Sequence, residues 1–199
     1  MHCVVFRLFL SAPLSDAEAA AWATPDELLY ARTLDSGRRR REWLSWRAIA
    51  RREVAAATGC AAQEVLLTYN EVGAPVIGNC PLHLAVSHCT GSVAVALSDA
   101  PCAVDVESLD RDFGRVASRY MTPVEAALCD DPRWPAVVWS AKETLYKYAG
   151  RRELDLLRDL RVEQPDWSTG TLVGRIGGGT PLRLRFFFLA GRVVCRSQA

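Results

Sequence analysis

The chain has 199 residues, and its 24 basic side chains nearly balance its 23 acidic ones, so the net charge of +1 argues against a general nucleic-acid-binding protein. Half of the residues are hydrophobic and 24% are charged, a composition that can bury a core and excludes intrinsic disorder as the default. No run approaches the roughly 18 apolar residues that span a membrane, and residues 1–12 lack the pattern of a secretory signal, so we expect a soluble protein with no membrane partner.

The first hundred residues predict a strand, then helices, then further strands. Residues 3–10 alternate as a strand does. Thr24-Pro25-Asp26-Glu27 has the pattern of a helix start, and this helix should run to about residue 34. Residues 37–58 predict a long helix, headed by four arginines and closed by Gly59. From residue 65 the period becomes two, which predicts strands at 66–69, 82–87, 93–97 and 103–107.

The rest of the chain shows the same order again. Residues 113–120 are expected to be helical, Thr122-Pro123-Val124-Glu125 repeats the helix-start pattern, and residues 134–149 predict a helix ended by Gly150. Strands are expected at 172–176, 182–189 and 192–195, and the last two meet at Ala190-Gly191. The order strand, helices, strands therefore occurs twice, without a repeat in residue identity.

Two carboxylates share one face of the strand at residues 103–107. Asp105 and Glu107 are two residues apart, so they point the same way while Val104 and Val106 point the other. Because adjacent carboxylates repel, this face either meets water or holds a cation. Hard oxygen ligands of this kind suit Mg²⁺. An ordinary half-exposed strand is the alternative interpretation.

The helix at residues 134–149 carries charges of both signs on one face. Trp139, Glu143 and Lys147 are spaced four apart and therefore lie on the same side. A surface salt bridge beside a core tryptophan would explain them equally well. However, the chain has 22 arginines and only two lysines, Lys142 and Lys147, and both lie in this helix. That exception suggests sites that need a compact ammonium group.

Ser87 and His88 end a strand and could both donate to a phosphate. A hydrolase triad with Asp105 is disfavoured because sequence neighbours on a strand point to opposite faces and the chain lacks a Gly-x-Ser-x-Gly turn. A zinc site is also disfavoured, since Cys80, His83, His88 and Cys89 lack paired spacing. The seven cysteines are odd in number and form no Cys-x-x-Cys pair, so we interpret them as small apolar residues and expect a cytoplasmic protein.

Taken together, the motifs resemble one known family. They are Gly73-Ala74-Pro75, Val86-Ser87-His88, Val104-Asp105-Val106-Glu107, Arg119-Tyr120-Met121 with Glu125, and Trp139-Ser140-Ala141-Lys142-Glu143 with Lys147. In order and approximate spacing they are similar to the 4'-phosphopantetheinyl transferases of the surfactin-synthetase type, over about residues 38–150. The resemblance implies an α+β pseudo-dimer of two similar α/β halves with small, mostly antiparallel sheets, at residues 1–102 and 103–199. It also implies coenzyme A as co-substrate, bound in the cleft between the halves, and a monomer.

The resemblance assigns roles to residues of this chain. It implies that Asp105, Glu107 and Glu143 bind Mg²⁺, that Lys142 and Lys147 lie near the pyrophosphate and the reaction centre, and that Glu143 and Lys147 are catalytic. It further implies that Ser87 and His88 contact phosphate and that Arg41, with Arg40 and Arg47 as alternatives, contacts the 3'-phosphate of coenzyme A. An acyl or peptidyl carrier protein should dock near Phe113, Tyr120 and Met121; plain core is the alternative for these three.

The chain also departs from the family pattern. Ala74 stands where the family commonly has lysine, Ala103 replaces a glycine and Cys89 replaces a serine. Two other functions stay open: an inactive relative that only binds carrier proteins, and another Mg²⁺-dependent phosphotransferase, although the chain lacks a Gly-x-x-x-x-Gly-Lys-Ser/Thr loop. The sequence does not identify the carrier, its pathway, the general base or the replacement for the missing lysine.

Overall fold

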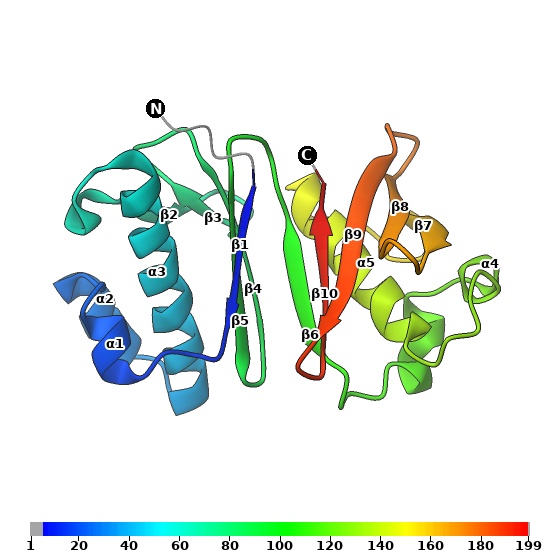
Figure 1. The fold of residues 1–199 in the computed structure, drawn as a ribbon, viewed down its shortest axis with the longest axis horizontal. Helices are drawn as coiled ribbons and strands as arrows, with labels where there is room; N and C mark the ends of the chain where they lie inside the picture. Colours follow the sequence, from blue (N-terminus) through cyan, green and yellow to red (C-terminus); the bar gives the residue numbers. More distant parts are fainter. Residues whose placement is uncertain (1–5, 199) are drawn as a thin grey trace. The chain divides into compact units, whose positions relative to one another are not determined.

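The computed structural model describes residues 6–198, and the chain divides into two compact units, residues 1–101 (unit 1) and 102–199 (unit 2). Each unit packs helices on a small antiparallel sheet, which confirms the expected α+β class (Figure 1). Within residues 6–198, no helix has both the length and the apolar character needed to cross a membrane.

Unit 1 is built around one long helix. In chain order, its elements are β1 (Arg7–Ser11), α1 (Asp16–Ala20), α2 (Pro25–Arg32), α3 (Gly37–Thr58), the 3₁₀ helix η1 (Ala62–Glu64), β2 (Leu67–Tyr69), β3 (Pro75–Ile77), β4 (His83–Cys89) and β5 (Ser92–Ser98). The main sheet has the order β1-β5-β4, and β2 and β3 form a separate pair. One side of α3 packs on β5 and β4, and α1 and α2 pack against α3.

The core of unit 1 follows from the helical spacing of α3. Trp46, Ile49 and Ala50 are buried on the same side of this helix and pack against Val93 and Val95 of β5. All seven residues of β5 are buried, as expected for the central strand of a covered sheet.

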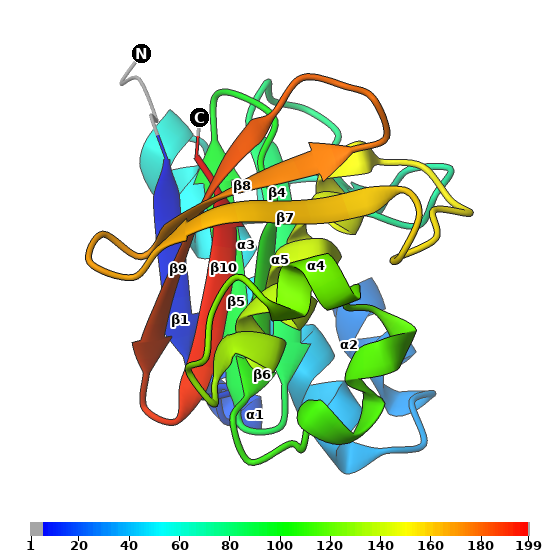
Figure 2. The same ribbon diagram turned by 90° about the vertical axis from the view of Figure 1, so that its right-hand side faces the viewer.

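Unit 2 is built around α5. Its elements are β6 (Val104–Ser108), the 3₁₀ helix η2 (Gly114–Arg119), α4 (Pro123–Ala126), α5 (Trp134–Ala149), β7 (Leu160–Asp166), β8 (Thr171–Ile176), β9 (Leu182–Leu189) and β10 (Arg192–Ser197). The antiparallel sheet has the order β6-β10-β9-β8-β7, and α5 contacts all five strands (Figure 2). At Gly174 of β8 an added Cβ would lie 2.6 Å from a methyl group of Leu145, so a larger residue here would force this buried side chain of α5 to move.

The two units share one topology. In each, the first strand pairs antiparallel with the last, β1 with β5 and β6 with β10. The last strand also pairs with its hairpin partner, β4 or β9, and the longest helix of the unit packs on that sheet. The repeated order of elements in the sequence is therefore also a repeat of strand pairing.

Most of the predicted helices and strands are present, and the differences concern element type and short elements that the sequence pattern does not indicate. The helices α2, α3 and α5 begin and end as predicted or within two residues, with Thr24 capping α2 and Gly59 in the left-handed conformation after α3. Of the first predicted strand, residues 3–5 lie outside the described residues. The helix expected at 113–120 is wrong in type, since η2 is a 3₁₀ helix. The sequence analysis missed α1, η1, β3 and β7.

Candidate functional site

One face of α5 lies against β6 in unit 2. Trp139 and Lys147, eight residues apart on α5, reach Glu107 and Asp105 of β6, and Glu143 lies between them on the same helix face. The two carboxylates share a strand face, as predicted, while Val104 and Val106 on the opposite side are buried in the core. The structure thus brings together five side chains that the sequence placed on two separate elements.

Lys147 forms an ion pair with Asp105. The Nζ atom lies 2.8 Å from Asp105 Oδ1 and also donates to the carbonyl oxygen of Val104 at 3.2 Å. Asp105 is only 4% exposed, whereas the Lys147 side chain is 32% exposed. This ammonium group is therefore anchored at a buried carboxylate and still reaches solvent, as a residue that contacts a substrate must.

Glu107 is held by donors from two directions. The indole Nε1 of Trp139 donates to Glu107 Oε1 at 2.7 Å, and Nη1 of Arg111 donates to the same oxygen at 3.2 Å. Burial raises the pKa of Glu107 and the charge of Asp105 raises it further, while the Trp139 hydrogen bond and the Arg111 and Lys147 charges lower it. The net effect is a raised pKa, so the pair of acidic residues on β6 is electrostatically unfavourable as it stands.

Glu143 experiences the same repulsion. Burial raises its pKa, and the carboxylates of Asp105 and Glu107 raise it further against the opposing charges of Lys147 and Arg111. A carboxylate whose pKa is raised toward neutrality is a better proton acceptor at physiological pH than an ordinary surface glutamate. Clustered carboxylates with raised pKa values are also typical of functional sites.

The donor chemistry of this cluster suits Mg²⁺, because carboxylate oxygens are the ligands that this ion prefers. Within residues 6–198, no three histidine, cysteine, aspartate or glutamate side chains are already gathered in a geometry that could hold a metal ion. Mg²⁺ usually takes one or two protein carboxylates and completes its octahedron with waters and substrate phosphates. The residues therefore fit Mg²⁺ in two respects: their oxygens are suitable ligands, and a cation would relieve the repulsion between the carboxylates. They do not by themselves surround an ion.

Lys142 corrects one expectation. It is fully buried, and its Nζ donates to both carboxylate oxygens of Glu125 and to the carbonyl oxygen of Leu156 at 2.7 Å. Burial lowers the pKa of Lys142, and the Glu125 hydrogen bond opposes that effect. Glu125 also accepts from the backbone N–H groups of Thr122 and Val162. Lys142 is thus a structural link between α5, α4 and β7, and the predicted pyrophosphate contact is wrong because its three donors already have protein partners.

Removing Lys142 should destabilise unit 2 strongly. Lys142→Ala leaves the Glu125 carboxylate buried without its counter-charge, which should lower the free energy of unfolding by about 3–5 kcal/mol. The double variant Lys142→Met with Glu125→Gln removes both charges and should recover most of that loss. Arg133→Ala, which breaks the exposed pair with Asp131, is the matched control at about 0–1 kcal/mol. Denaturant unfolding measures all three; equal losses for Lys142→Ala and Arg133→Ala would contradict the structural role.

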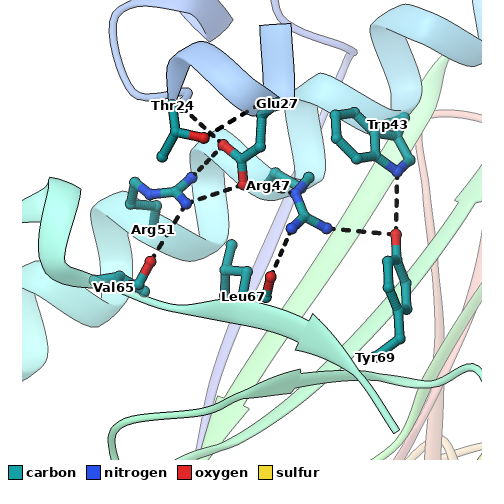
Figure 3. A network of polar contacts seen from close by, with 8 residues as sticks. All are labelled: Thr24, Glu27, Trp43, Arg47, Arg51, Val65, Leu67 and Tyr69. Carbon is teal, nitrogen blue, oxygen red and sulfur yellow. Dashed lines mark hydrogen bonds and ion pairs between the residues drawn. The ribbon is translucent and has the colours of Figure 1, made fainter. Parts of the chain in front are cut away.

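Arg47 corrects a second expectation, because it is part of a buried network in unit 1 (Figure 3). Its Nε donates to Glu27 Oε1 and its Nη2 to the carbonyl oxygen of Leu67, both at 2.7 Å. Arg51 donates to both oxygens of the same glutamate. The Arg47 guanidinium also lies 4.7 Å from the ring centroid of Trp43. Arg47 therefore ties α3 to α2 and β2 and is not available for a coenzyme A phosphate.

Among the alternatives for the 3'-phosphate contact, Arg40 and Arg41 differ in their surroundings. Arg40 donates to the carbonyl oxygen of Ala31, in the last turn of α2, and to that of Leu34, which follows the helix. Arg41 is exposed on the first turns of α3. This difference favours Arg41 over Arg40 and Arg47.

His88 and Ser87 lie on β4, beside α3. His88 Nδ1 is 3.3 Å from Glu42 Oε2, and Ser87 is buried while the His88 side chain is 45% exposed. On α3, Arg38 reaches one further residue after β4, donating to Thr90 Oγ1 at 2.8 Å. The arginine-headed end of α3 and the histidine therefore lie close together within unit 1.

Phe113 and Tyr120 are core residues, which corrects their predicted part in a docking surface. They are 4% and 0% exposed, and the Tyr120 hydroxyl donates to the carbonyl oxygens of Phe113 and Pro135. Met121 instead lines a surface cavity of about 410 Å³ beside α4. Next to it, Val124 is 75% exposed. The accessible apolar groups of this region therefore include Met121 at the cavity and Val124 on α4.

Sequence reasoning missed three polar residues of these clusters. Trp139 lies on the charged helix face that its spacing predicts, but this spacing does not predict that its indole N–H donates to Glu107. Arg111, four residues after Glu107, and Glu42, next to Arg41, gave no motif signal. Each of the three contacts a side chain outside its own helix or strand, and such contacts depend on how the chain packs.

Comparison with known proteins gives one match, and it falls almost entirely in unit 2. No curated protein matches the sequence. Residues 101–194 match the family model of the 4'-phosphopantetheinyl transferase superfamily, and the matched segment contains β6, α5 and the whole carboxylate cluster. This segment of the chain is therefore similar to the 4'-phosphopantetheinyl transferase superfamily.

Proposed function

We propose that this protein transfers 4'-phosphopantetheine from coenzyme A to a serine of an apo acyl or peptidyl carrier protein, with Mg²⁺, as an enzyme of the surfactin-synthetase type. The observation that carries the proposal is the meeting of Trp139, Glu143 and Lys147 of α5 with Asp105 and Glu107 of β6, inside the segment that matches the superfamily. In this proposal, the enzyme is a monomer and acts in the cytoplasm.

In the proposed reaction, the serine hydroxyl oxygen bonds to the β-phosphorus of coenzyme A, and the bond from that phosphorus to the bridging oxygen breaks. Adenosine 3',5'-bisphosphate leaves with the bridging oxygen and its electron pair. The serine proton passes to Glu143 or to a water molecule that the metal would activate when bound. Lys147 stabilises the negative charge that builds on the phosphates. When bound, Mg²⁺ would be held by Asp105, Glu107 and Glu143 and would contribute further charge stabilisation.

Unit 1 supplies the recognition of coenzyme A in this proposal. Arg41 is the contact to the 3'-phosphate, and Ser87 and His88 are phosphate donors on β4. Glu42 Oε2 of α3 lies 3.3 Å from His88 Nδ1, a contact that orients the imidazole on β4. No residue is assigned to replace the lysine that the family commonly has at the position of Ala74.

Loss of Arg41 should weaken binding rather than chemistry. The 3'-phosphate lies away from the bond that breaks, so Arg41→Ala should cost about 1–3 kcal/mol of coenzyme A affinity, the range for a charge-assisted contact. Calorimetry with coenzyme A and its 3'-dephospho form measures this, and the variant should no longer distinguish the two ligands. Arg32→Ala, at an exposed arginine of α2, is the control. A variant that keeps its preference for the 3'-phosphate would move the contact away from Arg41.

The carrier protein is proposed to dock at the apolar surface formed by Met121 and Val124. This surface lies at α4, which Glu125 and Lys142 tie to the helix that carries Glu143. Val124→Asp should therefore raise the KM for the carrier and leave coenzyme A binding unchanged.

One assay tests the proposed function directly. Purified protein is incubated with coenzyme A, Mg²⁺ and an apo carrier protein, and the carrier is analysed by mass spectrometry. Addition of phosphopantetheine to the carrier, absent from a carrier whose target serine is alanine, supports the proposal. Binding of the carrier without modification would support the inactive relative. Consumption of another phosphorylated substrate in place of coenzyme A would support a different phosphotransferase.

A further inference from the structure

Two donors hold the same carboxylate oxygen of Glu107. The indole N–H of Trp139 and the guanidinium of Arg111 both donate to Oε1. Because both contacts use Oε1, they leave Oε2 as the oxygen that Glu107 can offer to a cation. The shorter contact, 2.7 Å from Trp139 Nε1, comes from the neutral donor.

The Trp139 ring is itself held in place. It packs edge-on against Tyr120, with ring centroids 5.0 Å apart and planes at 80°, and it lies 6.4 Å from Phe113. Tyr120 is fully buried and anchored by its hydroxyl to two carbonyl oxygens. The guanidinium of Arg111 lies 4.9 Å from the centroids of both the Trp139 and Phe113 rings. The indole N–H therefore has a fixed direction.

A fixed donor is needed here because Glu107 would otherwise turn away. Asp105 lies two residues before it on the same strand face, and Glu143 faces both from α5, so like charges favour rotation of the Glu107 side chain toward solvent. Hydrogen bonds from outside the ligand set commonly orient metal-binding side chains against such forces.

We propose that Trp139 is a positioning residue: its indole N–H holds Oε1 of Glu107 so that Oε2 faces the divalent cation shared with Asp105 and Glu143. This inference rests on the proposed function. Arg111 reinforces the same oxygen, but its positive charge also repels a cation, so removing it changes cation affinity in two opposing directions. Trp139 is uncharged, and its substitution isolates the effect of orientation.

The test uses Mn²⁺ as the probe, because its free form is counted directly by electron paramagnetic resonance without any turnover. Trp139→Phe keeps an aromatic ring beside Tyr120 and removes the N–H. In the presence of coenzyme A, the variant should bind Mn²⁺ about tenfold more weakly than the parent protein. Raising the Mg²⁺ concentration should restore most of its transfer rate, which a purely structural defect would not allow.

Trp167→Phe is the matched control. Trp167 also packs in an aromatic cluster of unit 2, with Phe186 and Phe188, but its buried Nε1 has no hydrogen-bond partner among residues 6–198. This variant should bind Mn²⁺ like the parent. If Trp139→Phe does not fold, benzothienylalanine at position 139 keeps both fused rings and replaces only the N–H by sulfur.

The outcomes separate this inference from the proposed function. Unchanged Mn²⁺ affinity in the folded Trp139 variants, with a parent protein that binds the ion, would overturn the positioning role alone. Equal weakening by Trp167→Phe would overturn it too, since the effect would then come from packing. A parent protein that binds no Mn²⁺ in the presence of coenzyme A would overturn the carboxylate site itself, and with it both proposals.

Discussion

Asp105→Ala and Glu107→Ala should each abolish transfer of phosphopantetheine while the protein stays folded. Both carboxylates belong to the face of β6 that meets α5, and each supplies an oxygen that the proposed cation needs. Loss of one such charge-stabilising group lowers kcat by about a hundredfold or more. Asp105 is the more sensitive position, because it is buried and also anchors Lys147 at 2.8 Å.

The measurement is the initial rate of carrier modification at several Mg²⁺ concentrations, with a chelator as the zero point. Asp105→Asn separates charge from shape, since it keeps the side-chain volume and removes the negative charge. Asp131→Ala, which removes a half-buried carboxylate paired with Arg133 away from the cluster, should leave the rate unchanged. Near-parental rates for both Asp105→Ala and Glu107→Ala would exclude these residues as metal ligands.

Lys147→Ala should lower kcat by about a hundredfold or more, with a smaller effect on the affinity for coenzyme A. The reason is that its ammonium group stabilises charge that appears only as the bridging oxygen leaves. In the structure, the group is anchored to Asp105 and to the Val104 carbonyl oxygen while a third of the side chain stays exposed. An isolated surface pair would instead cost about 0.5 kcal/mol of stability and no activity.

Lys147→Arg tests the shape of the site. A planar guanidinium is larger than an ammonium group and cannot make the same two short contacts to Asp105 and Val104, so we expect low activity. Steady-state kinetics with the carrier as substrate measure kcat and KM for both variants. Arg133→Ala serves as the control for loss of a positive charge in unit 2. Full activity of Lys147→Arg would show that any cation suffices, and full activity of Lys147→Ala would remove the residue from the site.

Elements that depend on local contacts could be predicted from the sequence. Thr24 caps α2 because its Oγ1 accepts from the backbone N–H of Glu27, and Gly59 and Gly150, both in the left-handed conformation, follow directly after α3 and α5. These signals need only neighbouring residues, so the helix boundaries follow from the sequence. By contrast, β7 contains Pro165 and a shift in register between Glu163 and Asp166, and it pairs with β8 while both strands pack against α5.

For the site, the sequence by itself determined which residues share a face. A period of two placed Asp105 and Glu107 together on a strand, and a spacing of four placed Trp139, Glu143 and Lys147 together on a helix. Only the tertiary structure decided that these two faces meet and that the indole of Trp139 donates to Glu107. Side-chain partners so far apart in the chain are set by packing, which periodicity does not encode.

The same reason explains the two wrong assignments among the basic residues. Lys142 and Arg47 are basic residues in motifs, and sequence alone does not distinguish a cation that reaches a ligand from one that is buried against a carboxylate. Lys142 pairs with Glu125, which is 17 residues away in the sequence, and Arg47 pairs with Glu27, which is 20 residues away. The sequence determined the kinds of groups and their local order, and the tertiary structure decided which of them face solvent, because burial and ion pairing are properties of the packed chain.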